Sequence, residues 1–210
     1  MSLDSIYTAA VTDVLDGLGY PNQTLPSEIG PLSPGMRLAG PAFAVEGRPR
    51  PGMEYEPSIR RILEVLGAVP GGHVAVYATN DRTCAQFGEL SATSLNARGV
   101  AGVVLDGGCR DVDFIAREGF PVFARFVTPQ DSVPRWEVVE WGHEVTIAEV
   151  RVATGDYVLG DSDGVVVVPA ALTERVLAQA AAVVGTEDEV RRAVRDGMSP
   201  LEAFERFGKF

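Results

Sequence analysis

The residues best suited to chemistry lie at positions 106–111, directly after the apolar run 100–105. Arg110 and Asp111 are adjacent there, at the expected carboxyl end of a buried strand. A guanidinium holds carboxylates and enolates through paired hydrogen bonds and keeps its charge. Mg²⁺ accepts one or two carboxylates when water and substrate complete its shell. The segment predicts a site for an anionic substrate and a divalent metal; the alternative is a surface turn with an ion pair.

A second candidate is Gly88-Glu89-Leu90-Ser91, at the start of a predicted helix. The first turn of a helix offers unpaired N–H groups and the positive end of the helix dipole, which favour a carboxylate or phosphate. Glycine permits close approach of the backbone to a ligand. These four residues are candidates for substrate binding, and the alternative is an ordinary helix start with an acidic residue in its first turn.

Other reactive side chains are few and isolated. The histidines are His73 and His143, and the cysteines are Cys84 and Cys109. We interpret the histidines as structural or solvated and the cysteines as reduced packing residues, with Arg110 lowering the pKa of its neighbour Cys109. The phosphate-loop, nucleophile-elbow and zinc-protease motifs are absent from the sequence. Zinc hydrolases and histidine-based triads are therefore disfavoured.

Alternating strand and helix patterns surround the two candidate segments. Apolar runs at 73–78, 100–105 and 121–126 predict buried strands, and residues 89–98 and 112–118 predict the intervening helices. Residues 106–108 are predicted as a turn because they read Asp-Gly-Gly. This alternation implies a parallel sheet whose functional loops gather at the strand ends.

The rest of the chain completes an α/β pattern. We interpret Asp161-Ser162-Asp163-Gly164 as a hairpin turn, because it lacks the remaining ligands of a calcium loop. Residues 1–210 are therefore expected to form one α/β domain, with a C-terminal helical arm from about residue 171 that makes subunit contacts. The further predicted elements are helices at 6–18, 58–66, 171–195 and 200–207 and strands at 41–46, 136–139, 145–152, 157–160 and 165–168.

Composition narrows the class of partner. The 210 residues include 18 basic and 29 acidic side chains, which gives a formal net charge of −11. An acidic chain without a basic run is unsuited to nucleic acid or an anionic membrane as its main partner. Residues 1–19 lack the pattern of a signal peptide, and no apolar stretch is long enough to span a membrane. We therefore expect a cytoplasmic protein whose main partner is neither nucleic acid nor a membrane.

Several segments together resemble a known family. They are Thr8-Ala9-Ala10-Val11-Thr12-Asp13-Val14-Leu15, Gly88-Glu89-Leu90, Arg98-Gly99-Val100-Ala101-Gly102, residues 106–111 and residues 160–169. The chain resembles the RraA-like family, which includes 4-hydroxy-4-methyl-2-oxoglutarate aldolases with oxaloacetate decarboxylase activity and the RraA regulator of RNase E. The Gly-Glu-Leu loop combined with the later Arg-Asp pair is the most specific part of the resemblance.

The resemblance implies both a fold and a set of roles. The implied fold is an αββα sandwich of the swivelling β/β/α type, assembled as a homotrimer or hexamer with active sites between subunits. In the aldolases, backbone amides matching Gly88 to Ser91 hold the pyruvate carboxylate, and the arginine matching Arg110 contacts the 2-oxo oxygen. The aspartate matching Asp111 holds Mg²⁺ or Mn²⁺, largely through water. Asp111 favours the aldolase branch, because the regulators typically lack this aspartate.

Two segments depart from the aldolase pattern. The aldolases use a glutamate from the C-terminal helix of a neighbouring subunit, and here Glu187 or Glu189 could take that place. Residues 128–136 resemble a subgroup whose substrates are often unassigned. The resemblance therefore leaves the C4 substituent of the substrate open.

The residues and the resemblance together predict a metal-dependent carbon–carbon lyase. It would cleave a 4-hydroxy-2-oxo acid of the 4-hydroxy-4-methyl-2-oxoglutarate type to pyruvate and a second carbonyl product, with oxaloacetate decarboxylation as a side activity. Arg110 and the metal would stabilise the enolate, and Glu89 would position a water or hydroxide that takes the 4-hydroxyl proton. The alternatives are a non-catalytic regulator that binds a ribonuclease, or a related lyase or decarboxylase for another sugar-acid-derived oxo acid.

Overall fold

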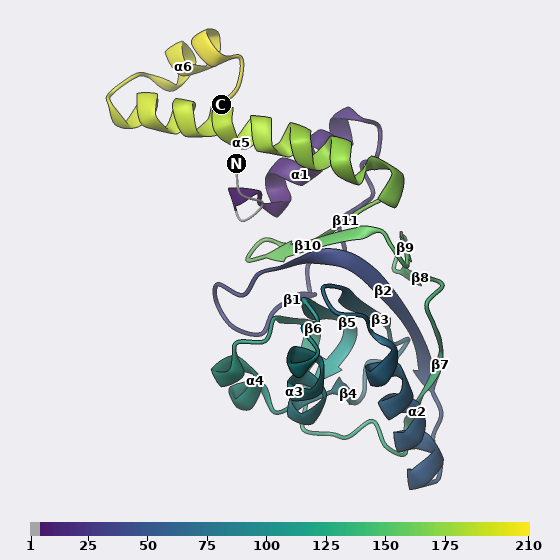
Figure 1. Ribbon diagram of the computed structural model, residues 1–210. Helices are drawn as coiled ribbons and strands as arrows, with labels where there is room; N and C mark the ends of the chain where they lie inside the picture. Colours follow the sequence, from purple (N-terminus) through teal and green to yellow (C-terminus); the bar gives the residue numbers. More distant parts are fainter. Residues whose placement is uncertain (1–4) are drawn as a thin grey trace.

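The computed structural model describes residues 5–210, so positions 1–4 of the predicted domain lie outside the described residues (Figure 1). The helices are α1 (Thr8–Gly17), α2 (Tyr55–Ala68), α3 (Glu89–Ala97), α4 (Val112–Glu118), α5 (Thr173–Arg195) and α6 (Pro200–Phe207), with a short 3₁₀ turn at Ala170–Leu172. The strands are β1 (Gly30–Pro31), β2 (Leu38–Pro49), β3 (Val74–Ala78), β4 (Ala85–Phe87), β5 (Gly102–Cys109), β6 (Val122–Val127), β7 (Trp136–Trp141), β8 (Glu144–Ile147), β9 (Val150–Ala153), β10 (Tyr157–Asp161) and β11 (Gly164–Val168).

The main sheet is mixed and curls back on itself. Its order is β1-β6-β5-β3-β2-β10-β11, with β4 paired to β5 and β7 paired to β2. The central strands β2, β3, β5 and β6 are parallel, as the sequence predicts, but β10 and β7 pair with β2 in the antiparallel sense. Leu25, just before β1, donates its N–H to the carbonyl of Val165 in β11 at 2.9 Å. The two ends of the sheet are thereby brought together.

The core consists of three clusters of buried side chains, because successive residues of a strand point to opposite faces of the sheet. In β2, Phe43 packs among residues of α2, α3 and α4, whereas its neighbour Ala44 faces the apolar interior of the curled sheet. In β11, Val167 faces that interior and Val166 packs among residues of α1 and α5. Figure 1 shows helices on both outer sides of the curled sheet. The predicted α/β fold with αββα layering is confirmed.

Strand β5 corrects the predicted turn at residues 106–108. The strand continues through these residues to Cys109. A Cβ atom on Gly107 would lie 2.4 Å from Gln86 Oε1, and one on Gly108 would lie 2.5 Å from the carbonyl of Cys84. Both glycines are therefore required because other chain segments pack directly against this strand, and the turn begins only at Arg110.

Other strand boundaries also differ from the sequence prediction. The strand predicted at 145–152 is divided into the hairpin β8–β9, with Ala148 at a φ of 53° in its turn. The short strands β1 and β4 were not predicted, because two or three residues are too few to display a periodic pattern. β2 is longer than predicted and continues to Pro49.

The predicted hairpin turn at residues 161–164 is confirmed, and its aspartate has a second role. Strands β10 and β11 pair with Asp161 opposite Gly164. The carboxylate of Asp161 also accepts the N–H of Thr8 at 2.8 Å and the hydroxyl of Thr8 at 2.7 Å. Asp161 therefore satisfies the start of α1 from a distant part of the chain.

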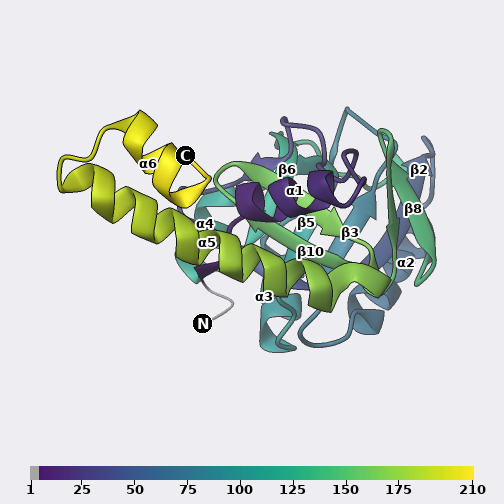
Figure 2. The same cartoon turned by 90° about the horizontal axis from the view of Figure 1, so that it is seen from above.

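The C-terminal helices α5 and α6 lie at one end of the molecule. Val176, Ala180 and Val184 on the first part of α5 pack against α1 and β11. The remainder of α5 and all of α6 extend beyond the sheet, as Figures 1 and 2 show from two directions. In residues 5–210, no helix combines the length and apolar character needed to cross a membrane.

Candidate active site

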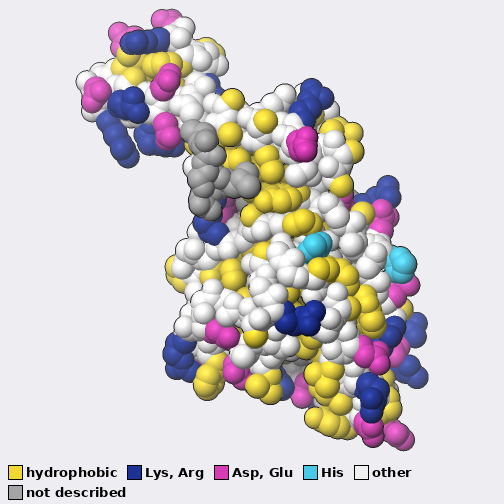
Figure 3. All heavy atoms as spheres, viewed as in Figure 1, with side chains coloured by type: hydrophobic (Ala, Val, Ile, Leu, Met, Phe, Trp, Pro, Cys, Tyr) yellow, Lys and Arg dark blue, Asp and Glu magenta, His cyan; other side chains and the backbone are white. Residues whose placement is uncertain are grey.

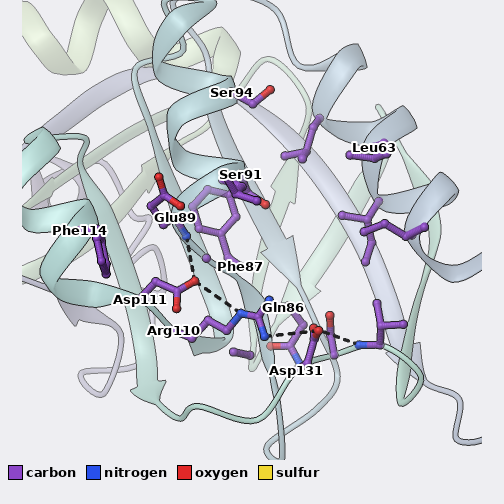
Figure 4. A pocket seen from close by; sticks show the side chains of 18 of the residues that line it. Leu63, Gln86, Phe87, Glu89, Ser91, Ser94, Arg110, Asp111, Phe114 and Asp131 are labelled. Atoms are coloured by element: carbon purple, nitrogen blue, oxygen red, sulfur yellow. Dashed lines mark hydrogen bonds and ion pairs between the residues drawn. The ribbon is translucent and has the colours of Figure 1, made fainter. Parts of the chain in front are cut away.

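A cleft of about 520 Å³ brings the two candidate segments together. It is lined by α2, by β4 and the start of α3, by the turn after β5, and by residues 131–133. Gly88, Glu89, Leu90 and Ser91 all line this cleft, as do Arg110 and Asp111. Figure 4 shows Glu89, Arg110 and Asp111 on one side of the cleft, with Leu63 of α2 on the other.

The turn after β5 fixes the direction of the Arg110 and Asp111 side chains. The N–H of Arg110 donates to the carbonyl of Phe87 at 3.0 Å, which ties this turn to β4. Asp111 has a left-handed backbone with φ 59° and ψ 31° and precedes the first residue of α4. Aspartate tolerates this conformation better than most residues. The fold thus holds Asp111 at a sharp corner between strand and helix.

Arg110 lies between two carboxylates. Its Nε is 3.5 Å from Asp111 Oδ2, and its Nη1 is 3.3 Å from Asp131 Oδ2 (Figure 4). All three side chains are partly exposed to the cleft, with 36 % of Arg110 and 42 % of each aspartate accessible. The guanidinium is therefore oriented from both ends while one face remains open to a ligand.

The start of α3 lies directly beside this group. The N–H of Glu89 donates to Asp111 Oδ2 at 3.3 Å, and the first bond inside the helix runs from the N–H of Ala92 to the carbonyl of Gly88 at 3.0 Å. The N–H groups of Leu90 and Ser91 come before that first bond, so they have no hydrogen-bond partner within the helix. They point out of the start of α3, which lines the cleft. The helix start can therefore supply two N–H donors to an anion.

The side chain of Glu89 points away from Arg110. Its Oε1 lies 3.5 Å from the hydroxyl of Thr93, one turn further along α3. Figure 4 shows the Glu89 carboxylate on the opposite side of its backbone from Asp111. Glu89 thus lines the cleft without making an ion pair to Arg110 in this conformation.

Asp131 is a site residue that the sequence reasoning missed. It belongs to an irregular segment between β6 and β7, which is tied to the site because the N–H of Ala85 donates to the carbonyl of Gln130 at 2.8 Å. Its Oδ1 accepts the N–H of Val133 at 3.2 Å, so its other oxygen is free to face Arg110. A hydrophilic residue between two prolines is a weak signal, and nothing local connects it to Arg110.

A buried polar network links β4 to the segment before it and to β5. Gln86 donates its amide to Asp81 Oδ2 at 2.7 Å and accepts the N–H of Gly108 at 2.9 Å. Burial would raise the pKa of Asp81, but hydrogen bonds from the Cys84 and Thr83 N–H groups and from their side chains lower it to about 2. Asp81 therefore stays ionised and holds the segment that leads into the site.

Both cysteines are buried and neither forms a disulfide. Burial raises the pKa of the Cys109 thiol to about 12, and burial together with Asp81 raises that of Cys84 to about 12. The expected lowering of the Cys109 pKa by Arg110 was wrong, because the thiol points into the apolar core and the guanidinium points into the cleft. Their interpretation as packing residues is consistent with this burial.

The remaining candidate groups lie outside the cleft. His73 contacts the carbonyl of Gly71, and Glu187 pairs with Lys209 on the arm at 3.0 Å. Among residues 5–210, no cluster of three or more His, Cys, Asp or Glu side chains forms a metal cage. The described chain can therefore offer a metal only one or two carboxylates, such as Asp111, at the open cleft.

Comparison with known proteins identifies the family. A family described as "RraA-like: Aldolase/RraA" matches residues 8–167. A relative from Halalkalibacterium halodurans, named "Putative 4-hydroxy-4-methyl-2-oxoglutarate aldolase", is 28% identical over 200 residues, which are 95% of this chain and 90% of the relative.

Two solved structures share the fold. A protein from Pseudomonas syringae pv. tomato superposes with a TM-score of 0.84 at 29% identity, covering 96% of this chain and 95% of that one. RraAS2 of Streptomyces coelicolor, described as an unusual member of the RNase ES inhibitor RraA family, gives 0.79 at 25% identity, covering 90% of this chain and 94% of that one. The resemblance predicted from the sequence is confirmed. With most of its length matched by the family and its fold shared with these structures, the chain belongs to the RraA-like family.

Proposed function

We propose that the protein is a divalent-metal-dependent aldolase that cleaves a 4-hydroxy-2-oxo acid to pyruvate and a second carbonyl product. The observation that carries the proposal is Arg110, held between Asp111 and Asp131 beside the start of α3. The names of aldolase relatives support the same reaction class. Oxaloacetate decarboxylation would follow as a side activity, because both reactions pass through the enolate of pyruvate.

The anionic end of the substrate would bind at the helix start. The N–H groups of Leu90 and Ser91, with the positive end of the α3 dipole, suit the carboxylate of a 2-oxo acid. Arg110 would then donate to the 2-oxo oxygen, where negative charge develops as the C3–C4 bond breaks. The fixed position of the guanidinium limits the reorganisation required during that step.

The charges of the site favour a bound dication. Arg110, Asp111 and Asp131 together carry one negative charge, so they alone would repel an anionic substrate. Asp111 has a carboxylate oxygen besides the one that faces Arg110 and Glu89, and the cleft is open to water. These groups fit Mg²⁺ or Mn²⁺ held by one or two carboxylates, water and substrate. Such an ion would act as a Lewis acid at the 2-oxo group.

Cleavage also requires transfer of the 4-hydroxyl proton. Glu89 lines the cleft and would position a water molecule that accepts this proton after its side chain rotates from Thr93. The C4–O bond becomes a carbonyl, the C3–C4 electron pair passes to C3 as the enolate, and protonation at C3 yields pyruvate. Arg110 and Glu89 are therefore the proposed catalytic residues.

The assembly and setting belong to the same proposal. We expect one domain and a cytoplasmic homotrimer or hexamer in which the arm of α5 and α6 reaches a neighbouring subunit. Leu201 and Phe204 on α6 are more than half exposed, which leaves apolar surface for such a contact. Glu187 or Glu189 would then approach the neighbouring site. The likeness to RraAS2 supports an RNase-binding regulator as the second candidate function.

A pyruvate-release assay tests the proposal. Lactate dehydrogenase would report pyruvate from a panel of 4-hydroxy-2-oxo acids and from oxaloacetate. We expect EDTA to abolish the activity, Mg²⁺ or Mn²⁺ to restore it, and Arg110→Ala to reduce it at least about 100-fold without changing the assembly. Arg151→Ala, which removes an exposed arginine on β9, is the control. Metal-independent cleavage, or full activity of Arg110→Ala, would contradict the proposal.

A further inference from the structure

The cleft has one polar side and one apolar side. The polar side contains the α3 start and Arg110, whereas the facing side is a row of apolar residues on α2. Figure 4 shows Leu63 on α2 across the cleft from Arg110 and Asp111. The residues of this α2 wall are Tyr55, Ile59, Ile62, Leu63 and Leu66.

The α2 wall is more exposed than a helix packed only against the core would be. The buried residues of α2 are Ser58, Val65 and Leu66, and of these three only Leu66 also lines the cleft. Leu63 is 59 % exposed and Tyr55 is 68 % exposed. Figure 3 shows hydrophobic side chains gathered over this end of the molecule, with charged side chains along its outer edge. The wall therefore offers apolar area that a ligand in the cleft can cover.

The charged residues of α2 are directed elsewhere. Arg60 pairs with Glu56 at 2.9 Å, and Arg61 pairs with Glu64 at 3.2 Å. The Arg61 guanidinium also stacks on Trp141 at 4.2 Å from the ring centre. None of these four charged residues lines the cleft. The wall therefore provides no cation for a second carboxylate.

Arg98 is the other cation that lines the cleft, and it is engaged at the end of α2. Its Nη2 donates to the carbonyl of Gly67 at 2.8 Å and to that of Val69 at 3.2 Å. Among the described lining residues, Arg110 is thus the cation placed to meet an anionic head group. A carboxylate at the far end of the ligand would be desolvated against α2 without a partner there.

We infer that the cleft binds 2-oxo acids whose far end is apolar, and that Leu63 and its neighbours on α2 select this end. The inference rests on the proposed function for the placement of the 2-oxo acid head at Arg110. It departs from the compound in the relatives' names, since an oxoglutarate carries a second carboxylate. Each CH₂ group buried on α2 would strengthen binding about fourfold.

Calorimetric titration of the full chain with Mg²⁺ present tests this selectivity. The probes are 2-oxohexanoate and 2-oxoadipate, which differ at the far end by a methyl group against a carboxylate. We expect 2-oxohexanoate to bind at least about tenfold more tightly. Leu63→Lys should reduce or reverse that preference by a similar factor. Tyr20→Lys, which changes an exposed aromatic residue after α1 and outside the cleft, should leave the preference unchanged.

Several outcomes would overturn the inference. The first is that 2-oxoadipate binds as tightly as 2-oxohexanoate or more tightly. The second is that 2-oxohexanoate binds no more tightly than pyruvate. The third is that Leu63→Lys changes the mass of the assembly, measured by light scattering, but leaves the ligand preference unchanged. The last result would identify the wall as a contact with a second copy. The pyruvate-release assay separates this inference from the proposed function. If the protein cleaves 4-hydroxy-2-oxo acids but binds 2-oxoadipate more tightly, only the inference is contradicted. If it prefers 2-oxohexanoate but releases no pyruvate, only the aldolase proposal is contradicted.

Discussion

Gly88 and Asp111 approach each other so closely that a Cβ atom on residue 88 would lie 2.7 Å from Asp111 Oδ2. The same atom would lie 3.1 Å from Cγ of Arg110. Gly88 has a φ of −154°, which any residue can adopt, so its conformation does not require glycine. The requirement comes from the space needed by the Arg110–Asp111 pair, which supports a direct link between the two segments selected from the sequence.

Gly88→Ala should therefore damage the site more than the fold. The methyl group would displace Asp111 and Arg110, and misplacement of catalytic groups by less than an ångström lowers kcat/KM by about 10–100-fold. We expect the free energy of unfolding in urea to fall by about 1 kcal/mol or less. Gly17→Ala in α1, where a Cβ atom meets nothing within 4 Å, is the matched control and should keep full activity. Unchanged kinetics for Gly88→Ala would contradict the close packing.

Asp131→Asn should separate kcat from KM. The asparagine oxygen can still accept the N–H of Val133, so the segment keeps its turn, but the charge that orients Arg110 is lost. We expect kcat to fall about tenfold because the guanidinium is less fixed. KM should stay equal or decrease, because one negative charge near the anionic substrate has been removed. An increased KM with an unchanged kcat would show that Asp131 contributes to binding alone.

The regular part of the fold is predictable from the sequence because its pattern is local. The apolar run of β5 and the Gly-Glu start of α3 each identify their element without reference to the rest of the chain. Residues 106–108 misled the prediction because Asp-Gly-Gly is typical of turns. Here the glycines accommodate Gln86 and Cys84 against a continuing strand, and that packing is not visible in the local sequence.

The site was predictable only where its residues lie in recognisable segments. Arg110 and Asp111 follow a buried strand, so their position at a strand end could be inferred. Asp131 lies in an irregular segment, and its contact with Arg110 depends on how β4 and residues 130–131 pack together. Apart from Tyr55, the residues of the α2 wall lie in the helix predicted at 58–66, but a helical pattern alone cannot show whether an apolar face meets the core or a cleft.

Asp81→Asn should give a stability deficit that depends on pH. Asp81 Oδ2 accepts the N–H groups of Thr83 and Cys84 at 3.0 Å, and an asparagine oxygen in that position would accept them without the charge that strengthens the bonds. The amide nitrogen would then replace Oδ1, which accepts the hydroxyl of Thr83. We expect a loss of about 2–3 kcal/mol at pH 7. The folded pKa is lowered from 3.8 to about 2, so the stabilisation by ionised Asp81 is complete above 3.8 and is lost as the pH falls toward 2.

Urea denaturation of wild type and Asp81→Asn at pH 7 and pH 3 measures this dependence. The difference in unfolding free energy should narrow by about 1 kcal/mol at pH 3, because the unfolded wild-type chain is then largely protonated at this residue while the folded chain is not. Acid effects from other carboxylates cancel between the two proteins. A deficit of the same size at both pH values would contradict the lowered pKa of Asp81.

Asp161→Ala should destabilise the fold while sparing the site. Asp161 is buried, and its carboxylate accepts the Thr8 N–H and hydroxyl together with the N–H of Asp163. Removing it leaves the start of α1 unsatisfied, which costs about 2 kcal/mol. Because α1 packs on β10 and β11, across the curled sheet from the cleft, kcat/KM should stay within about twofold of wild type. Ser162→Ala in the same turn is exposed and serves as the control. Superimposable urea curves for the two variants would show that the contact between Asp161 and Thr8 contributes nothing to stability.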